Sequence, residues 1–313
     1  MSFSTAPDPL DPEFTKDKHE SQFTLVIQDL INGSIDPESA ARTIDKIVVD
    51  ECQEAFVSYT SVPNPTPEQL ADGTILSPQP AGWEHFLWNC LGIAAMKLPA
   101  DDASQDRLVS LVQELQRLPR HTVPWLAAGC LKEKELWNLS RENGYAYFKQ
   151  WLWELHEGHF AGRGHIEKDT DASTAYLNFS SFLARLLASY VVDTTSLCAL
   201  IRPSSFAKSP LPAQYEAYSN AGTQWIQYAG EALYEMCAKG ALEIGKKRWT
   251  QGLWNSWKAK FAFIKDNDEF TKEGRERATI ALDRMAQIET KGLDGIRGGV
   301  VEHFGFIIAE EQA

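Results

Sequence analysis

The sequence has no long hydrophobic run and no leader-like N-terminus. No window approaches the ~18 consecutive apolar residues that a membrane-spanning helix needs, and the apolar stretch 182–192 is interrupted by Arg185 and Ser189. The first residues run directly into Asp8 and Pro9, without a basic or an apolar region. We therefore expect neither a membrane partner nor a secretory signal.

Basic residues are too few for a nucleic-acid-binding surface. The chain has 30 Lys and Arg against 43 Asp and Glu, a formal net charge of −13. Because lysine and arginine supply the phosphate contacts on which affinity for DNA and RNA depends, we expect no nucleic-acid partner.

Cysteines are few, odd in number and widely spaced. The five form no C-x-x-C pair, which argues against a zinc ribbon or a redox dithiol. Most stand among apolar residues, and we interpret them as reduced thiols of the core. This predicts a cytoplasmic protein, with the nucleus as the alternative compartment.

The common nucleotide-binding and acyl-transfer motifs are missing as well. The glycine-rich segment 292–299 matches neither G-x-G-x-x-G nor G-x-x-x-x-G-K-[ST], and the chain has no G-x-S-x-G elbow. No flavin, nicotinamide or haem motif is found, so the sequence leaves the cofactor unknown.

Helical periodicity runs through almost the whole chain. Apolar residues recur at helical spacing over 21–33 and again from Asp36 to Val48, which predicts a helical hairpin. Strand signals are sparse, so we predict an all-α fold, either an irregular multi-helix bundle or a stack of helical hairpins. Further helices are expected over 83–98, 101–118, about 130–155, 172–193, 211–239, 247–265 and 269–289.

Polar and proline-bearing segments flank and interrupt these helices. Residues 1–20 are predicted to form a flexible N-terminal arm, and 291–313 a C-terminal tail. Between them, 21–290 is predicted to form a single helical domain, or two lobes joined by the proline-rich connector 61–82.

The densest group of titratable side chains contains His156, His159 and His165. The first two would share a helix face, and the third could complete a three-nitrogen set for zinc or non-haem iron. The alternative is a polar helix end with histidines in solvent, which the absence of the H-E-x-x-H spacing favours.

Asp101, Asp102 and Asp106 form a D-D-x-x-x-D string, similar to the aspartates that hold magnesium against a diphosphate in helical isoprenoid synthases. The nearest match to the second metal-binding triplet of those enzymes has Arg275 where a carboxylate is needed. The three aspartates are also well explained as first-turn acids of the following helix.

Ten tryptophans form the other conspicuous feature, and most are expected in the core. Some can also wall an apolar ligand cavity between helices. Asn178 and Arg185, seven residues apart on one helix face, are a candidate polar pair of such a cavity, although they could instead bridge backbone groups or pair with a carboxylate. The candidate ligand-binding residues are Asn178, Arg185, Trp225, Tyr228, Trp254, Trp257 and Lys258.

Four segments share a family pattern: 88–118, 177–186, 221–230 and 249–261. Together they resemble a fungal family of unknown function over most of 22–289. Members of that family are sometimes labelled OpdG-type oxidoreductases, and some are found in secondary-metabolite gene clusters. The resemblance implies redox tailoring of a small metabolite, and it carries no assigned catalytic residue.

We therefore expect a small-molecule-binding helical protein, and more specifically a tailoring enzyme of fungal secondary metabolism. One alternative is a non-catalytic helical scaffold that binds protein partners through its acidic surface and the 61–82 connector. The other is magnesium-dependent diphosphate chemistry of the terpene type.

Overall fold

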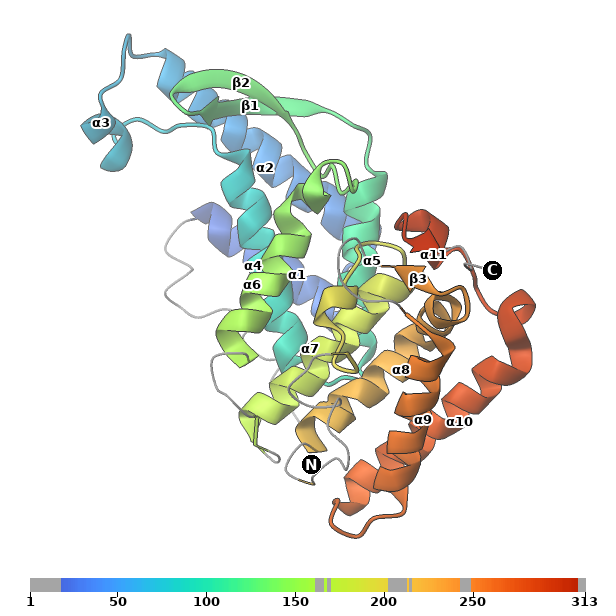
Figure 1. Ribbon diagram of the computed structural model, residues 1–313. Coiled ribbons are helices and arrows are strands. Elements are labelled where there is room, and N and C mark those ends of the chain that lie inside the picture. The colour runs from blue at the N-terminus through green and yellow to red at the C-terminus, as the bar shows by residue number, and fades with distance from the viewer. Residues whose placement is uncertain are drawn as a thin grey trace. The chain divides into compact units, whose positions relative to one another are not determined.

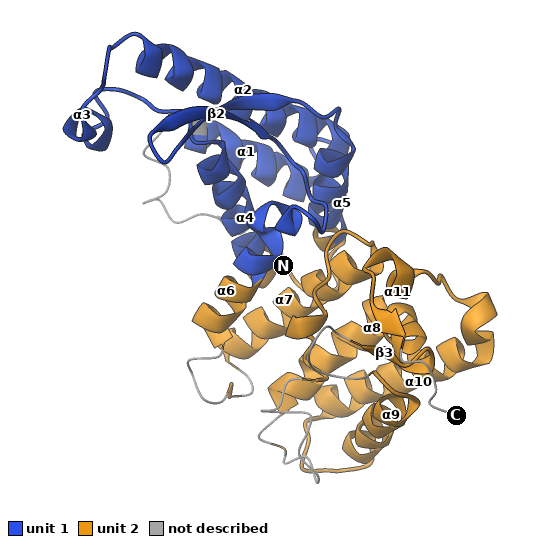
Figure 2. Cartoon of the chain, turned by 45° about the horizontal axis from the view of Figure 1, so that its top comes forward, with its two compact units in different colours: residues 1–94, 106–152 blue, residues 95–105, 153–313 orange. Residues whose placement is uncertain are grey.

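The fold is mostly helical, as the sequence predicts. The structure is a computed structural model and describes residues 18–160, 166–167, 170–201, 213, 216–242 and 249–308. Helices dominate these residues, and two small antiparallel sheets of two strands each accompany them (Figure 1). The chain divides into two compact units, unit 1 from residues 1–94 and 106–152 and unit 2 from 95–105 and 153–313 (Figure 2).

Unit 1 is built on helices from the first half of the chain. Its elements are α1 (Lys18–Asn32), α2 (Pro37–Thr60), α3 (Pro67–Ala71), most of α4 (Pro80–Lys97) and of α5 (Ala103–Arg117), β1 (Thr122–Ala127), β2 (Cys130–Glu135) and the start of α6 (Phe148–Phe160). The helices α1 and α2 form the predicted hairpin and pack against each other. Gly33 ends the first with a φ of 73°, and Asp36 caps the second by accepting from the Ser39 amide at 2.9 Å.

A β-hairpin corrects the predicted helix over 130–155. The strands β1 and β2 pair antiparallel up to Ala127 and Cys130, and the two residues between them, Ala128 and Gly129, have φ angles of 49° and 77°. Two successive positive φ angles are typical of the tight turns whose twist matches a hairpin. The turn lacks the Asn-Gly or Asp-Gly signal that would have predicted it, and the helix begins only at Phe148.

A left-handed turn precedes α6 and has no counterpart in the sequence predictions. Residues 144–147 all have positive φ angles, between 49° and 63°. Such angles are costly for residues with a Cβ and persist only where packing enforces them. Here the Trp88 indole donates to the Ala146 carbonyl at 3.0 Å and stacks on Phe148 at 4.4 Å, so tertiary contacts fix the direction in which α6 starts.

Unit 2 is a helical body with a short second sheet. Its elements, after the last turn of α4 and the start of α5, are the remainder of α6, α7 (Asp171–Ala188), α8 (Glu216–Ala238), β3 (Ala241–Leu242), α9 (Gln251–Lys265), α10 (Lys272–Gly295), α11 (Val300–His303) and β4 (Ile307–Ile308). The helix α8 packs against α7, α9 and α10, and β3 pairs with β4. Seventeen of its 23 residues are buried, so α8 forms the centre of this core.

The structure describes the whole predicted connector, and only part of the predicted N-terminal arm and C-terminal tail. The connector 61–82 contains α3 and lies within unit 1. Of the predicted arm 1–20, residues 1–17 lie outside the described residues, as do 309–313 of the predicted tail. The described part of the tail holds the end of α10, then α11 and β4.

Four of the five free cysteines are buried, and Cys130 at the hairpin is exposed. Burial raises the pKa of the Cys52, Cys90 and Cys237 thiols to about 12, so these thiols stay protonated and unreactive at neutral pH. Among the described helices, none is both long and apolar enough to span a bilayer.

Candidate functional site

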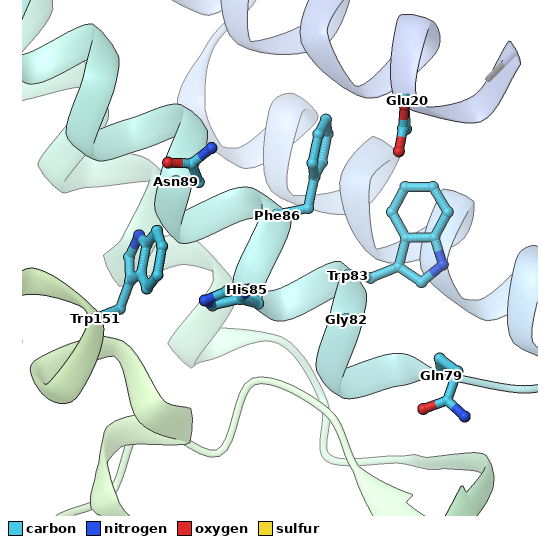
Figure 3. A pocket seen from close by; sticks show the side chains of 8 residues that line it. All are labelled: Glu20, Gln79, Gly82, Trp83, His85, Phe86, Asn89 and Trp151. Atoms are coloured by element: carbon cyan, nitrogen blue, oxygen red, sulfur yellow. The ribbon is translucent and has the colours of Figure 1, made fainter. Parts of the chain in front are cut away.

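A large cavity lies in unit 1, at the start of α4. It has a volume of about 600 Å³, within the range of about 300–1,000 Å³ that is usual for small-molecule sites. We call it the aromatic pocket (Figure 3). It is lined by Glu20, Gln79, Gly82, Trp83, His85, Phe86, Asn89 and Trp151.

The helix α4 presents two opposite faces, and one of them forms the floor of this pocket. Gly82, His85, Phe86 and Asn89 follow the spacing i, i+3, i+4, i+7, and therefore lie on one stripe. A second stripe, two residues further along, has the same spacing and is buried. It consists of Glu84, Leu87, Trp88 and Leu91.

The buried stripe is anchored to the β-hairpin by a charged pair. Glu84, with 1% of its surface exposed, lies 2.7 Å from the Lys134 ammonium through Oε2 and accepts from the Trp137 amide at 3.4 Å. Burial raises the pKa of the Glu84 carboxyl above its ordinary value, while the Lys134 charge opposes this shift. The pair holds α4 so that its other face remains open to the pocket.

One wall of the pocket is aromatic and stiff. The Trp83 and Phe86 rings are half-buried and nearly perpendicular, with centroids 6.1 Å apart. Phe23 of α1, which is fully buried, contacts both rings from behind, at 5.9 and 5.5 Å. On the same side, Glu20 reaches from the first turn of α1 into the pocket (Figure 3).

The opposite wall combines aromatic and hydrogen-bonding groups. The His85 ring meets Trp151 of α6 edge to face, with centroids 4.0 Å apart. The Trp151 Nε1 atom is buried, yet it has no hydrogen-bond partner among the described residues. Asn89 lies on the same side of the pocket (Figure 3). A buried donor without an acceptor costs roughly 1–3 kcal/mol.

Three of the sequence-predicted ligand-binding residues come together in unit 2. Asn178 donates to the Met96 carbonyl at 2.9 Å, and Arg185 donates to the Ala100 carbonyl, also at 2.9 Å. The Arg185 guanidinium lies 3.5 Å from the centroid of the Tyr228 ring, and the Tyr228 hydroxyl donates to Asp101 Oδ1 at 3.1 Å.

Two residues that the sequence did not single out complete this arrangement. Ser181 donates to the Ala100 carbonyl at 2.8 Å, and the fully buried Gln105 donates to the carbonyls of Ala95 and Leu98, both at 3.0 Å. We call Gln105, Asn178, Ser181 and Arg185 the carbonyl network. It satisfies backbone acceptors at the end of α4 and in the following loop, where a helix leaves carbonyls without partners.

The other four predicted ligand-binding residues lie in the helical core of unit 2 or at its edge. Trp225, Trp254 and Trp257 are at most 1% exposed. The Trp254 indole donates to Glu289 Oε1 at 2.8 Å, and Lys258 lies 2.5 Å from Oε2 of the same carboxylate. None of the seven predicted residues lines either cavity described here, and their ligand-binding role stays a prediction.

The predicted histidine site is only partly within the described residues. His156 is buried, and its ring packs against Phe160 and Tyr176 at 5.5 and 5.7 Å, whereas His159 is exposed. His165 lies outside the described residues. Across the described ranges, no three His, Cys, Asp or Glu side chains come together in a way that could hold a metal ion.

In the predicted D-D-x-x-x-D string, Asp102 caps a helix and Asp101 accepts a side-chain hydrogen bond. Asp102 precedes α5 and accepts from the Ser104 amide at 2.7 Å, as a helix cap does. Asp101 accepts from Tyr228, as described above.

A second described cavity, of about 100 Å³, lies in unit 2 beside the start of α10. Its buried carboxylate, Glu216, accepts from the Thr271 amide at 3.1 Å and from the Thr271 hydroxyl. Gly274 leaves room for that carboxylate, because a Cβ there would lie 2.3 Å from Glu216 Oε1. Glu216 thus serves as a cap for α10, which accounts for its burial.

The sequence analysis missed the aromatic pocket, although one signal pointed to it. The sequence predicts a helix over 83–98 and no site on it. The stripe of Gly82, His85, Phe86 and Asn89 interrupts the apolar character of that helix with a small, a titratable and an amide side chain. Trp151, which closes the pocket, is brought there by the left-handed turn, and no local pattern predicts that.

Comparison with known proteins finds a match to a family model. A family model described as a protein of unknown function, DUF3632, matches residues 88–261. No curated protein and no solved structure matches the chain. Of the residues that line the aromatic pocket, Asn89 and Trp151 fall within the matched range.

Proposed function

The chain belongs to the DUF3632 family, whose function is unknown, and we propose that it is a small-molecule-binding protein whose ligand occupies the aromatic pocket of unit 1. The observation that carries this proposal is a cavity of about 600 Å³ whose lining combines three large aromatic side chains with the polar side chains of His85 and Asn89. Ring surfaces with a few polar groups are typical of small-molecule sites.

The lining indicates the general chemistry of the ligand. Trp83, Phe86 and Trp151 offer large ring surfaces that are half-buried, so an apolar or aromatic body can displace water from them. The Asn89 amide supplies both a hydrogen-bond donor and an acceptor. The ligand is therefore a mainly apolar molecule that carries a carbonyl or hydroxyl oxygen.

A tailoring enzyme of fungal secondary metabolism is the more specific form of this proposal. His85 is the titratable ring that contacts Trp151 in the pocket, which makes it the residue for proton transfer to or from a bound metabolite. A redox step would require a cofactor in addition. A non-catalytic scaffold for protein partners is the competing proposal, and it predicts that substitutions in the pocket leave small-molecule binding unchanged.

The test is a pair of substitutions, one in α6 and one in α4. Prodan, a neutral aromatic fluorophore with a ketone oxygen, serves as the probe, and its Kd is measured by fluorescence titration. Trp151→Phe keeps a ring beside His85 and removes part of the ring surface in the wall of the pocket, so we expect the Kd to rise by about 3- to 10-fold. Trp83→Ala removes a wall of the pocket and is expected to weaken binding further.

The matched control is Trp153→Phe. Trp153 lies two residues along α6, is 45% exposed and does not line the pocket. The Kd of the Trp153→Phe protein for prodan is expected to stay within about twofold of the wild-type value. If prodan does not bind, or if Trp83→Ala and Trp151→Phe both leave its Kd unchanged, the proposal is wrong and the scaffold is favoured.

A further inference from the structure

Gly82 lines the aromatic pocket without contributing a side chain to it. It lies in the first turn of α4 and is exposed. A Cβ placed on Gly82 would meet one atom within 4 Å apart from its chain neighbours and the backbone of its own helix, the Gln79 Cβ at 3.8 Å. That distance is ordinary van der Waals contact, so the space beside Gly82 is open and belongs to the pocket.

Neither the backbone nor the packing requires glycine at position 82. The φ angle of Gly82 lies outside the left-handed region. By contrast, a Cβ on Gly222 or Gly230 of α8 would lie 2.7 Å from the Leu200 or the Ile288 side chain, so packing explains those two glycines. Alanine is the better helix former and would fit at position 82. Folding therefore does not account for this glycine, whereas a ligand that approaches the helix backbone would.

The open direction at Gly82 points between the two walls of the pocket. Successive residues of an α-helix are rotated by about 100°, so Trp83 projects about 100° to one side of Gly82 and His85 about 60° to the other. Figure 3 shows Trp83 and Phe86 on one side of α4, and His85 facing Trp151 on the other. A guest that rests on Gly82 therefore reaches both walls.

Both walls consist of rings, which favours a flat aromatic guest. The Trp83 and Phe86 rings meet at an interplanar angle of 83°, and the His85 and Trp151 rings at 72°. Aromatic pairs prefer offset-stacked or edge-to-face contacts, which raise affinity about 2- to 12-fold beyond the effect of the buried area. A flat ring system can also lie with its face on the Cα of Gly82, whereas a globular body of equal size touches the helix at fewer points.

We propose that the ligand of the aromatic pocket is a planar aromatic compound whose ring system lies across Gly82, and that Gly82 determines the specificity for flat molecules. This inference rests on the proposed function, since it names the class of ligand and a specificity residue for the same pocket.

The first test compares a flat ketone with a globular one. 2-Acetylnaphthalene and 1-acetyladamantane have the same number of carbon atoms and the same acetyl group, but one ring system is planar and the other is a cage. Kd values are measured by calorimetry, and competition with prodan shows that each ketone occupies the same pocket. We expect 2-acetylnaphthalene to bind about tenfold more tightly.

The second test uses a matched pair of glycine variants. Gly82→Ala adds one methyl group to the floor of the pocket, and we expect it to weaken 2-acetylnaphthalene binding by about 5- to 10-fold. Binding of 1-acetyladamantane should change by no more than about twofold, because a cage does not reach the helix backbone. Gly158→Ala is the control, since Gly158 is an exposed residue of α6 that does not line the pocket, and a Cβ there would meet nothing within 4 Å.

The Gly158→Ala protein should bind both ketones within about twofold of wild type. Both alanine variants should unfold at a denaturant concentration no lower than that of wild type, because alanine favours a helix over glycine. Weaker binding by Gly82→Ala would then be a change in the pocket and not a loss of the fold.

Three results would overturn the inference. The first is that 1-acetyladamantane binds to wild type at least as tightly as 2-acetylnaphthalene. The second is that Gly82→Ala binds 2-acetylnaphthalene within twofold of wild type, and the third is that Gly82→Ala, unlike Gly158→Ala, is destabilised. In each case, prodan binding that still depends on Trp83 and Trp151 would leave the proposed function standing. If wild type does not bind prodan at all, the proposed function itself fails.

Discussion

The first turns of α4 and its last turn differ in how their polar surroundings are satisfied. At the start, in unit 1, a helix face opens onto a cavity that the polar side chains of His85 and Asn89 help to line. At the end, in unit 2, the carbonyls of Ala95, Met96, Leu98 and Ala100 each accept from a buried side chain of the carbonyl network. Both surroundings are rich in polar and aromatic residues.

This difference in hydrogen bonding indicates which polar residues contribute to stability and which to ligand binding. A polar side chain whose donors already bond to backbone acceptors lowers the cost of burying those acceptors. It has few donors left to bind a ligand. A polar side chain that lines a cavity, as Asn89 does, can contact a ligand there. We therefore expect substitutions in the carbonyl network to change stability, and substitutions in the aromatic pocket to change binding.

The largest expected effect concerns the charged pair that holds the pocket helix in place. Lys134→Met leaves the Glu84 carboxylate buried without its cation, and we expect the free energy of unfolding at neutral pH to fall by about 3–5 kcal/mol. Chemical denaturation measures this. The double variant Glu84→Gln/Lys134→Met removes both charges and is expected to recover most of the loss.

The pH dependence of this variant has a definite sign. Without Lys134, the pKa of Glu84 rises further above its ordinary value, because burial then acts unopposed. A raised folded-state pKa gives stability at low pH that is lost as the pH rises through that pKa. The deficit of Lys134→Met relative to wild type should therefore be smaller near pH 5 than near pH 8, where the buried carboxyl is ionised. An equal deficit at both pH values would show that Glu84 is not a buried anion.

The next effect tests the carbonyl network directly. Arg185→Met keeps most of the aliphatic stem but removes the donor to Ala100 and the cation over the Tyr228 ring, so we expect a loss of about 2–4 kcal/mol in the free energy of unfolding. Arg42→Met is the control, since Arg42 is exposed and pairs with Glu38 on the same helix, and it should cost no more than about 0.5 kcal/mol.

Prodan binding to the folded Arg185→Met protein should stay within about twofold of wild type. If the variant is as stable as wild type but no longer binds prodan, Arg185 is a ligand-binding residue. The assignment of stability to one end of α4 and of binding to the other would then be wrong.

Local sequence patterns predicted much of the helical part of this fold. The cap at Asp36 and the left-handed Gly33 are local signals, and the structure contains both. The β-hairpin and the turn at residues 144–147 are different, because their backbone angles occur at alanine and tyrosine rather than glycine or asparagine. Trp88, almost sixty residues earlier in the chain, enforces the second of them, and no window of the sequence contains both partners.

Local sequence patterns had the same limit for the candidate sites, both for residues that they selected and for residues that they missed. The sequence predicts Asn178 and Arg185 as a candidate polar pair, because they are polar residues in an apolar helix. Their partners are backbone carbonyls some eighty residues away, which a sequence pattern does not display. The residues of the aromatic pocket were passed over because Trp83 and Trp151 resemble core residues until the fold shows that each is only half-buried.

The smallest expected effect concerns Tyr228, which the sequence placed among the ligand-binding residues. Burial holds the pKa of Tyr228 above its ordinary value, so its hydroxyl stays protonated at neutral pH and donates to Asp101. Tyr228→Phe removes this bond and keeps the ring under Arg185, which should lower the free energy of unfolding by about 0.5–1.5 kcal/mol. Asp101→Ala should cost a similar amount, and combining the two should add little, because both remove the same bond. Since the hydroxyl is already engaged, the Kd for prodan should not move by more than about twofold; a larger change would mean that Tyr228 contacts the ligand, and that the polar residues near the end of α4 are as available for binding as the wall of the aromatic pocket.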